Sequence, residues 1–228
     1  MNKILKIGHR GAKGYEPENT LVAFQKAIDL GCDGIELDVQ LSSDFEIIVI
    51  HDETIDRTTI GKGFVNQMTL SDLKTFKIAD KYEIPTLKEV FELINYNILI
   101  NIELKSYETT DKVVEFIENQ VSNKNRTFEN IIVSSFDWNA LQQVRFLNDK
   151  IQIGVLTATD LDLAFAFAKF IKAKTINPYF HLLTQENVAK IQEKGFEIHT
   201  WTVNEIEDIE KMKSLKVDGI ISDFPDRI

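Results

Sequence analysis

Short runs of apolar residues recur along the whole chain, separated by longer segments in which apolar residues follow a helical spacing. Side chains alternate with a period of two along a strand and about 3.6 along a helix, so the runs predict strands and the longer segments predict helices. The predicted strands are residues 4–8, 34–41, 98–104, 131–135, 151–156, 175–177, 198–202 and 219–222. The predicted helices are residues 20–30, 87–94, 110–121, 138–146, 161–170, 185–193 and 205–213.

This alternation of strands and helices is typical of parallel strands joined by helical crossovers. Eight strands in 228 residues predict a closed (β/α)8 TIM barrel, formed by a single domain over residues 1–228. A doubly wound open sheet is the alternative, although no G-x-G-x-x-G motif follows the first strand. One polar segment, residues 52–84, lacks the barrel period. It follows an apparent extension of the second strand at 46–51, so we expect a small insertion at the barrel mouth.

The charge of the chain limits its partners. With 26 basic and 36 acidic residues, the formal net charge is −10, and such a surface repels nucleic acid and anionic membranes. We therefore expect no nucleic-acid partner and no stable membrane association. The single cysteine, Cys32, excludes an internal disulfide and fits a cytoplasmic location. Lys6 and Gly8 interrupt the first apolar run, so we expect no secretory signal.

Polar residues interrupt two of the predicted strands in a regular way. In residues 34–41 the apolar side chains occupy alternate positions, which leaves Glu36 and Asp38 to face the barrel interior. The same alternation in residues 98–104 leaves Asn101, Glu103 and Lys105 facing inward. Carboxylates that converge in a poorly solvated mouth repel one another unless a cation or basic side chains hold them. Oxygen ligands favour a hard ion, so we expect Mg²⁺ or Ca²⁺ on Glu36, Asp38 and Glu103.

Two histidines follow predicted strands. His9 and Arg10 stand between two glycines after the first strand, where the backbone can approach a ligand closely, and His51 ends the extension of the second strand. The histidines can serve as a general acid and base, and Arg10 can bind phosphate through two hydrogen bonds. Trp201 near the seventh strand can wall the pocket or pack in the core.

Three other residues have simpler interpretations. We expect His199 to be a packed, hydrogen-bonded histidine, His181 to lie on a surface loop, and Cys32 to be a small packed residue at a helix end.

Several motifs resemble those of the glycerophosphodiester phosphodiesterase family. The chain carries Gly8-His9-Arg10-Gly11, then Pro17-Glu18-Asn19-Thr20, Asp33-Gly34-Ile35-Glu36-Leu37-Asp38-Val39 and His51-Asp52-Glu53-Thr54-Ile55-Asp56-Arg57-Thr58-Thr59. Further on are Ile84-Pro85-Thr86-Leu87, Asn101-Ile102-Glu103-Leu104-Lys105, Thr200-Trp201-Thr202-Val203-Asn204 and Ser222-Asp223-Phe224-Pro225-Asp226. Their order over residues 8–226 makes the resemblance specific.

The resemblance implies a TIM barrel with an insertion after the second strand and a divalent metal on Glu36, Asp38 and Glu103. It also implies that His9 and His51 are catalytic, and that Arg10 and Lys105 contact phosphate. The implied reaction hydrolyses a small-molecule glycerophosphodiester to glycerol 3-phosphate and an alcohol. The nucleophile is either water or the glycerol hydroxyl of the substrate, and the sequence favours neither.

Other functions remain open at this point. A phospholipase D-like enzyme acting on lysophospholipids would need an apolar surface at the mouth, to which Phe64, Val65 and Met68 in the insertion would contribute. We expect changes at Phe64 or Met68 to alter head-group selectivity. A non-catalytic barrel that binds a phosphorylated ligand would not need two histidines. A phosphosugar isomerase or aldolase would more often carry a late glycine-rich phosphate loop, which the sequence lacks. The head group, the metal and the oligomeric state are left undetermined.

Overall fold

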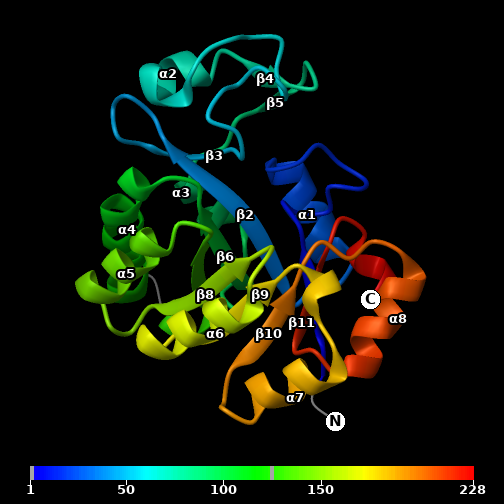
Figure 1. The fold of residues 1–228 in the computed structure, drawn as a ribbon. Coiled ribbons are helices and arrows are strands. Elements are labelled where there is room, and N and C mark those ends of the chain that lie inside the picture. Colours follow the sequence, from blue (N-terminus) through cyan, green and yellow to red (C-terminus); the bar gives the residue numbers. More distant parts are fainter. Residues whose placement is uncertain (1–2, 124–125) are drawn as a thin grey trace.

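A computed structural model describes residues 3–123 and 126–228, and eight of its parallel strands close into a barrel (Figure 1). β1 pairs with β2 on one side and with β11 on the other, which closes the ring. This closure confirms the predicted (β/α)8 barrel and excludes the open sheet. The barrel strands are β1 (Leu5–Gly8), β2 (Gly34–Leu41), β6 (Leu99–Leu104), β7 (Ile131–Ser135), β8 (Gln152–Thr157), β9 (Thr175–Pro178), β10 (Glu197–Thr200) and β11 (Gly219–Ser222).

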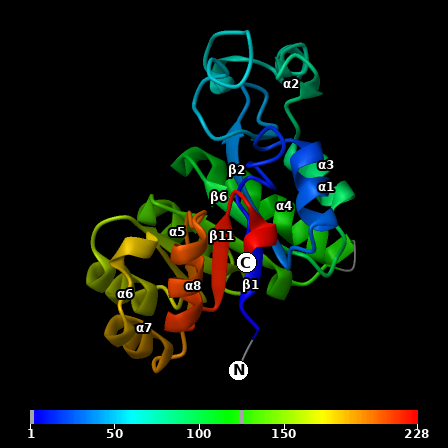
Figure 2. The same ribbon diagram turned by 90° about the vertical axis from the view of Figure 1, so that its right-hand side faces the viewer.

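Helices surround the barrel (Figure 2). The main hydrophobic core lies between these helices and the barrel strands. Several helices begin at a side chain that accepts a hydrogen bond from the first turn, as Thr20, Thr86 and Asp160 do. Within the described residues no helix has the length and apolar character that crossing a membrane requires. The helices between the barrel strands are α1 (Leu21–Asp29), α3 (Leu87–Leu93), α4 (Thr110–Asn123), α5 (Trp138–Leu147), α6 (Leu161–Phe170), α7 (Gln185–Gln192) and α8 (Ile206–Leu215).

The segment that follows β2 departs from the sequence prediction. Residues 46–51 do not extend β2. The chain turns back at Phe45, whose φ of 63° is left-handed, and β3 (Ile47–Val49) pairs antiparallel with β2. This reversal returns the chain from the tip of β2, so that Ile50 donates a backbone hydrogen bond to Asp38. His51 therefore lies beside the polar residues of β2 rather than beyond the end of that strand.

The expected insertion has structure of its own. It contains η1 (Val65–Gln67), α2 (Leu70–Leu73) and the antiparallel pair β4 (Lys77–Ile78) and β5 (Tyr82–Glu83), and it stands over one side of the barrel mouth (Figures 1 and 2). A separate cluster of buried apolar side chains supports it. This cluster consists of Ile48, Ile50, Ile55, Val65, Leu73, Ile78 and Ile84. Because its strands are two residues long and its apolar residues are scattered, no sequence periodicity revealed these elements.

Candidate active site

Three carboxylates converge where β2 and β6 approach the mouth of the barrel. β2 and β6 pair with Glu36 opposite Asn101 and Asp38 opposite Glu103, so the inward faces of the two strands coincide. Glu36, Asp38 and Glu103 each offer an oxygen, and these atoms lie within 4.8 Å of one another. Glu36 and Asp38 are buried. The inward orientation predicted from the alternation of apolar residues is therefore what the structure has.

The negative charges of these three carboxylates repel one another. Burial raises the pKa of Glu36 well above its usual value, and the neighbouring Asp38 and Glu103 raise it further. Burial and Asp38 likewise raise the pKa of Glu103 to about 7. Asp38 Oδ1 is buried and accepts no hydrogen bond within the described residues. Clustered hard oxygens with a spare buried acceptor fit a divalent cation such as Mg²⁺ or Ca²⁺.

His9 is held by an acidic partner from the other end of the chain. His9 Nδ1 lies 2.6 Å from Asp223 Oδ1, and Asn204 donates to the second oxygen of Asp223 at 2.9 Å. Desolvation of the buried ring lowers the pKa of His9, although Asp223 acts in the opposite direction. The contact to Nδ1 leaves Nε2 as the ring nitrogen available for proton transfer.

His51 has a matching arrangement. Its Nδ1 lies 2.6 Å from Asp52 Oδ1, and its Nε2 lies 3.0 Å from Lys105 Nζ. Lys105 in turn donates to Glu103 at 2.6 Å. Burial lowers the pKa of His51, opposed by Asp38 and Asp52. Burial also disfavours the charge of Lys105, but Glu103 and Asp38 outweigh it and raise the pKa of that lysine. Lys105 therefore stays charged between a carboxylate and an imidazole.

Arg10 joins the first loop to the carboxylates. Its backbone N–H donates to Glu36 at 2.9 Å, and its Nη1 donates to Glu18 at 2.8 Å. Arg10 Nε lies 3.1 Å from Asp38 Oδ2 as an ion pair, without hydrogen-bond geometry. The left-handed backbone of Arg10, with φ 51°, turns the chain back over the mouth, where Gly11 continues the turn at φ 84°. A Cβ on Gly11 would lie 2.6 Å from the backbone of Ala23, so this position requires glycine.

The predicted site residues, apart from Asp38, line one hollow of about 160 Å³. One wall is apolar: Phe136 and Trp201 meet edge to face with ring centroids 5.4 Å apart. The indole N–H of Trp201 donates to the backbone of Asn177 at 2.7 Å, which fixes the ring. The side chains that line the hollow are His9, Arg10, Glu36, His51, Asn101, Glu103, Lys105, Ser134, Phe136, Leu156, Trp201, Thr202 and Ile221.

Other sequence interpretations have mixed outcomes. His199 is packed as expected, but neither ring nitrogen has a hydrogen-bond partner among the described residues, so the expected hydrogen bond was wrong. The buried ring packs against Gly219, and desolvation lowers its pKa to about 4. His181 is exposed as expected, although it lies in the short helix η4 (Phe180–Leu182) rather than on a loop. Cys32 is buried, as expected. Phe64 and Met68 do not line the hollow, and their effect on selectivity stays a prediction.

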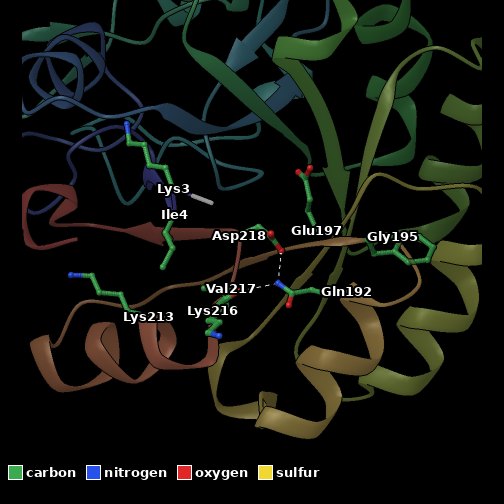
Figure 3. A pocket seen from close by; sticks show the side chains of 10 residues that line it. Lys3, Ile4, Gln192, Gly195, Glu197, Lys213, Lys216, Val217 and Asp218 are labelled. Atoms are coloured by element: carbon green, nitrogen blue, oxygen red, sulfur yellow. Dashed lines mark hydrogen bonds between the residues drawn. The ribbon is translucent and has the colours of Figure 1, made fainter. Parts of the chain in front are cut away.

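A larger hollow of about 470 Å³ lies at the other end of the barrel, where β1, β10 and β11 begin. Figure 3 shows lysines spread around its edge, with Gln192 hydrogen-bonded to Asp218. Asp218 also accepts from the backbone of Ile198, so it holds local structure. No histidine lines this hollow, and its size alone does not make it a reaction site. Barrel active sites lie at the opposite end, where the strands finish.

Sequence reasoning overlooked the groups that support the catalytic candidates. The quoted motifs include Asp223, Asp52 and Glu18 but indicate no role for them, and no motif points to Phe136. Their partners are distant in sequence: His9 and Asp223 are 214 residues apart. An aspartate directly after His51 is the one local signal that could have been recognised.

Two histidines, each paired with a carboxylate, and a cationic pair beside an acidic cluster define a TIM-barrel enzyme with a site suited to phosphate esters. Residues 9–227 match the sequence model of the glycerophosphoryl diester phosphodiesterase family. The chain belongs to this family, which confirms the resemblance drawn from its motifs.

Individual proteins that resemble this chain support its membership of the family. The chain is 39% identical over 234 residues to a glycerophosphodiester phosphodiesterase of Caldanaerobacter subterraneus subsp. tengcongensis, covering 99% of this chain and 96% of the relative. A crystal structure of the glycerophosphodiester phosphodiesterase of Thermotoga maritima superposes with a TM-score of 0.85 at 32% identity, covering 99% and 97% of the two chains. An Oleispira antarctica phosphodiesterase in complex with the product sn-glycerol-3-phosphate superposes with a TM-score of 0.88 at 25% identity, covering 97% and 94%.

Proposed function

We propose that this chain hydrolyses glycerophosphodiesters to glycerol 3-phosphate and an alcohol, with a divalent metal ion bound by Glu36, Asp38 and Glu103. The observation that carries the proposal is one hollow lined by two histidines, each held by an aspartate, beside three clustered carboxylates. The product complex of the Oleispira antarctica relative supports glycerol 3-phosphate as the product. The catalytic unit is the whole barrel with its insertion.

Cationic groups neutralise the phosphate. Arg10 and Lys105 line the hollow and bind the phosphoryl oxygens, where their charges stabilise the negative charge that builds in the transition state. Lys105 already lies between Glu103 and His51, so it exchanges part of this contact for a phosphoryl oxygen when substrate enters. When bound, Mg²⁺ or Ca²⁺ supplies further Lewis-acid stabilisation of the phosphate.

The histidines move the protons. His9, next to Arg10, acts as the general base and removes the proton of the attacking oxygen, which belongs to water or to the glycerol hydroxyl of the substrate. Attack by that hydroxyl expels the alcohol and gives a cyclic phosphate, which water then opens to glycerol 3-phosphate. His51 acts as the general acid and gives a proton from Nε2 to the leaving alkoxide. Asp223 and Asp52 hold the Nδ1 atoms and so fix the orientation of each ring.

A turnover screen tests the proposal. Glycerophosphocholine, glycerophosphoethanolamine, glycerophosphoglycerol and lysophosphatidylcholine are incubated with the protein in Mg²⁺, Ca²⁺ or EDTA, and glycerol 3-phosphate and free alcohol are quantified. We expect turnover of at least one glycerophosphodiester with a divalent cation and none in EDTA. Turnover of lysophosphatidylcholine alone would replace the proposal by the phospholipase D-like alternative. Binding of glycerol 3-phosphate without any turnover would make the chain a binding protein.

A further inference from the structure

Arg57, in the insertion, donates hydrogen bonds to two carboxylates at once. Its Nε and Nη2 donate to the two oxygens of Asp52 at 2.7 and 3.1 Å. Its Nη1 and Nη2 donate to the two oxygens of Glu18 at 3.0 and 2.7 Å. The guanidinium thus makes two bidentate contacts, a geometry that fixes both partners in direction as well as in distance.

The two carboxylates belong to different loops of the site. Asp52 holds Nδ1 of His51 at 2.6 Å, and Glu18 belongs to the loop after β1 and also accepts from Arg10 at 2.8 Å. Asp52 and Glu18 have no hydrogen bond to each other in the described structure, and Arg57 bridges them. Backbone and side-chain bonds already tie the His51 segment to the barrel strands, and Arg57 adds a link from Asp52 to the loop after β1.

The charges support a permanent contact. Burial works against ionisation of Glu18, but the hydrogen bonds from Arg57 and the charge of Arg10 lower its pKa to about 2. Hydrogen bonds from Arg57 likewise hold the pKa of Asp52 far below its usual value. Both carboxylates stay ionised at any pH at which a histidine can exchange protons, so the bridge persists throughout catalysis.

A purely structural role fits the arginine less well. Its side chain is 48% exposed, so solvent screens part of its contribution to folding, although bidentate pairs contribute more than single ones. The insertion is also supported by its own cluster of seven buried apolar residues. Two of the hydrogen bonds of Arg57 instead reach Asp52, the carboxylate that contacts the ring of His51.

We propose that Arg57 is a positioning residue for His51: it clamps Asp52 to Glu18 and thereby aims Nε2 of His51 at the leaving group. The inference rests on the proposed function, since it assumes that His51 transfers a proton. It predicts that loss of Arg57 impairs the reaction mainly through His51, since the bond from Arg10 to Glu18 does not pass through Arg57.

A double-mutant cycle tests the proposal with glycerophosphocholine as substrate and saturating metal. The variants are Arg57→Ala, His51→Ala and their combination. In the wild-type background we expect Arg57→Ala to lower kcat by about tenfold or more, because a misdirected proton donor is felt mainly in the transition state. In the His51→Ala background the same change should cost less than about twofold, since its target is gone. An equal loss in both backgrounds overturns the proposal.

Matched variants separate positioning from general damage. Lys62→Ala removes another exposed basic side chain of the insertion, which pairs with Asp56 at 3.7 Å, and should leave kcat at the wild-type value. Arg57→Lys keeps the charge but cannot make both bidentate contacts, so it should recover only part of the activity. Full recovery by lysine, or an equal loss in Lys62→Ala, contradicts a geometric role.

A measurement without turnover keeps this inference distinct from the proposed function. In ¹H–¹⁵N spectra of the histidine rings, the His51 Nδ1–H should be sharp in the wild type and should broaden or shift in Arg57→Ala. The His9 signal should stay in place, since Asp223 has no bond to Arg57. An unchanged His51 signal overturns the positioning role even if the enzyme is active. If the wild type turns over none of the substrates, the proposed function fails, and the spectra alone decide whether Arg57 orients the ring.

Discussion

Nζ of Lys105 lies 3.0 Å from Nε2 of His51. A lysine ammonium has only donors, so the imidazole accepts at Nε2 and carries its proton on Nδ1, toward Asp52. In this arrangement His51 cannot donate from Nε2. In the proposed mechanism phosphate draws Lys105 away, and Nε2 then takes up a proton from solvent, so that His51 can act as the general acid.

Replacement of Lys105 by methionine should remove one of the two cationic contacts to the phosphate, although it leaves Nε2 of His51 free. The change keeps the length of the side chain but removes its charge, and we expect kcat/KM to fall by about two to three orders of magnitude, as for loss of one transition-state donor. Steady-state kinetics at saturating metal measure the effect. Lys112→Met, at an exposed lysine paired with Glu115, is the control and should match the wild type. A Lys105→Met enzyme with wild-type kcat/KM would remove this lysine from the phosphate site.

The acidic cluster makes the stability of the metal-free protein depend on pH. Burial and Asp38 raise the pKa of Glu103 to about 7, against an unfolded value near 4.5. Between these values the folded state holds a proton that the unfolded state has lost, so stability falls as the pH rises from about 4.5 to 7. In EDTA we expect this loss to appear in the melting temperature, and Glu103→Gln should lessen it.

Addition of Mg²⁺ or Ca²⁺ should reverse that loss. The ion binds the assembled carboxylates and not the unfolded chain, so it raises the melting temperature, and more at pH 8 than at pH 5 because protons compete with it. Chelation should abolish turnover and a divalent cation should restore it. Full activity in EDTA after exhaustive dialysis would contradict the metal assignment.

Substitutions at two aromatic residues can show whether the hollow or the insertion determines head-group selectivity. Phe136 lines the hollow beside Trp201, whereas Phe64 in the insertion does not line it. Phe136→Ala should change the ratio of kcat/KM between glycerophosphocholine and glycerophosphoglycerol by about threefold or more, in line with the loss of one aromatic contact. Phe64→Ala should change this ratio less. The reverse order would support the sequence-based expectation that the insertion selects the head group.

The sequence predicted the barrel and the metal candidates because local periodicity determines both. Glu36 and Asp38 stand among alternating apolar residues, so their inward direction follows from the pleat of a single strand. The position of His51 could not be obtained in this way. It depends on the reversal at Phe45, where a non-glycine residue takes a left-handed conformation that tertiary contacts must impose.

The pairs formed by a site residue and the side chain that holds it could not be predicted from the sequence, for a related reason. His9 with Asp223, and Arg57 with Glu18, join segments that only the closed barrel brings together, 214 and 39 residues apart. No pattern within a single strand or helix encodes such a pair. The motifs identify the family of the chain, whereas the hydrogen-bond partners of these residues follow only from the folded structure.

The last prediction assigns the two proton transfers. We expect His51 to be the acid and His9 the base. A general acid matters when the leaving group is basic, and little when a stable anion departs. His51→Ala should therefore lose far more kcat/KM on glycerophosphocholine than on a nitrophenyl ester of glycerol phosphate, whereas His9→Ala should lose a similar factor on both.

The supporting carboxylates extend this comparison. Asp52→Asn acts on His51, and Asp223→Asn acts on His9, so each should repeat the leaving-group pattern of its own histidine at a smaller size. The difference in ΔΔG‡ between the two esters, taken from kcat/KM at saturating metal, is the quantity to compare. If His9→Ala and Asp223→Asn show the selective loss on the choline ester instead, the roles are reversed. Agreement within each pair is the stronger evidence, because two substitutions at different positions, whose side chains share one hydrogen bond, would then report the same proton.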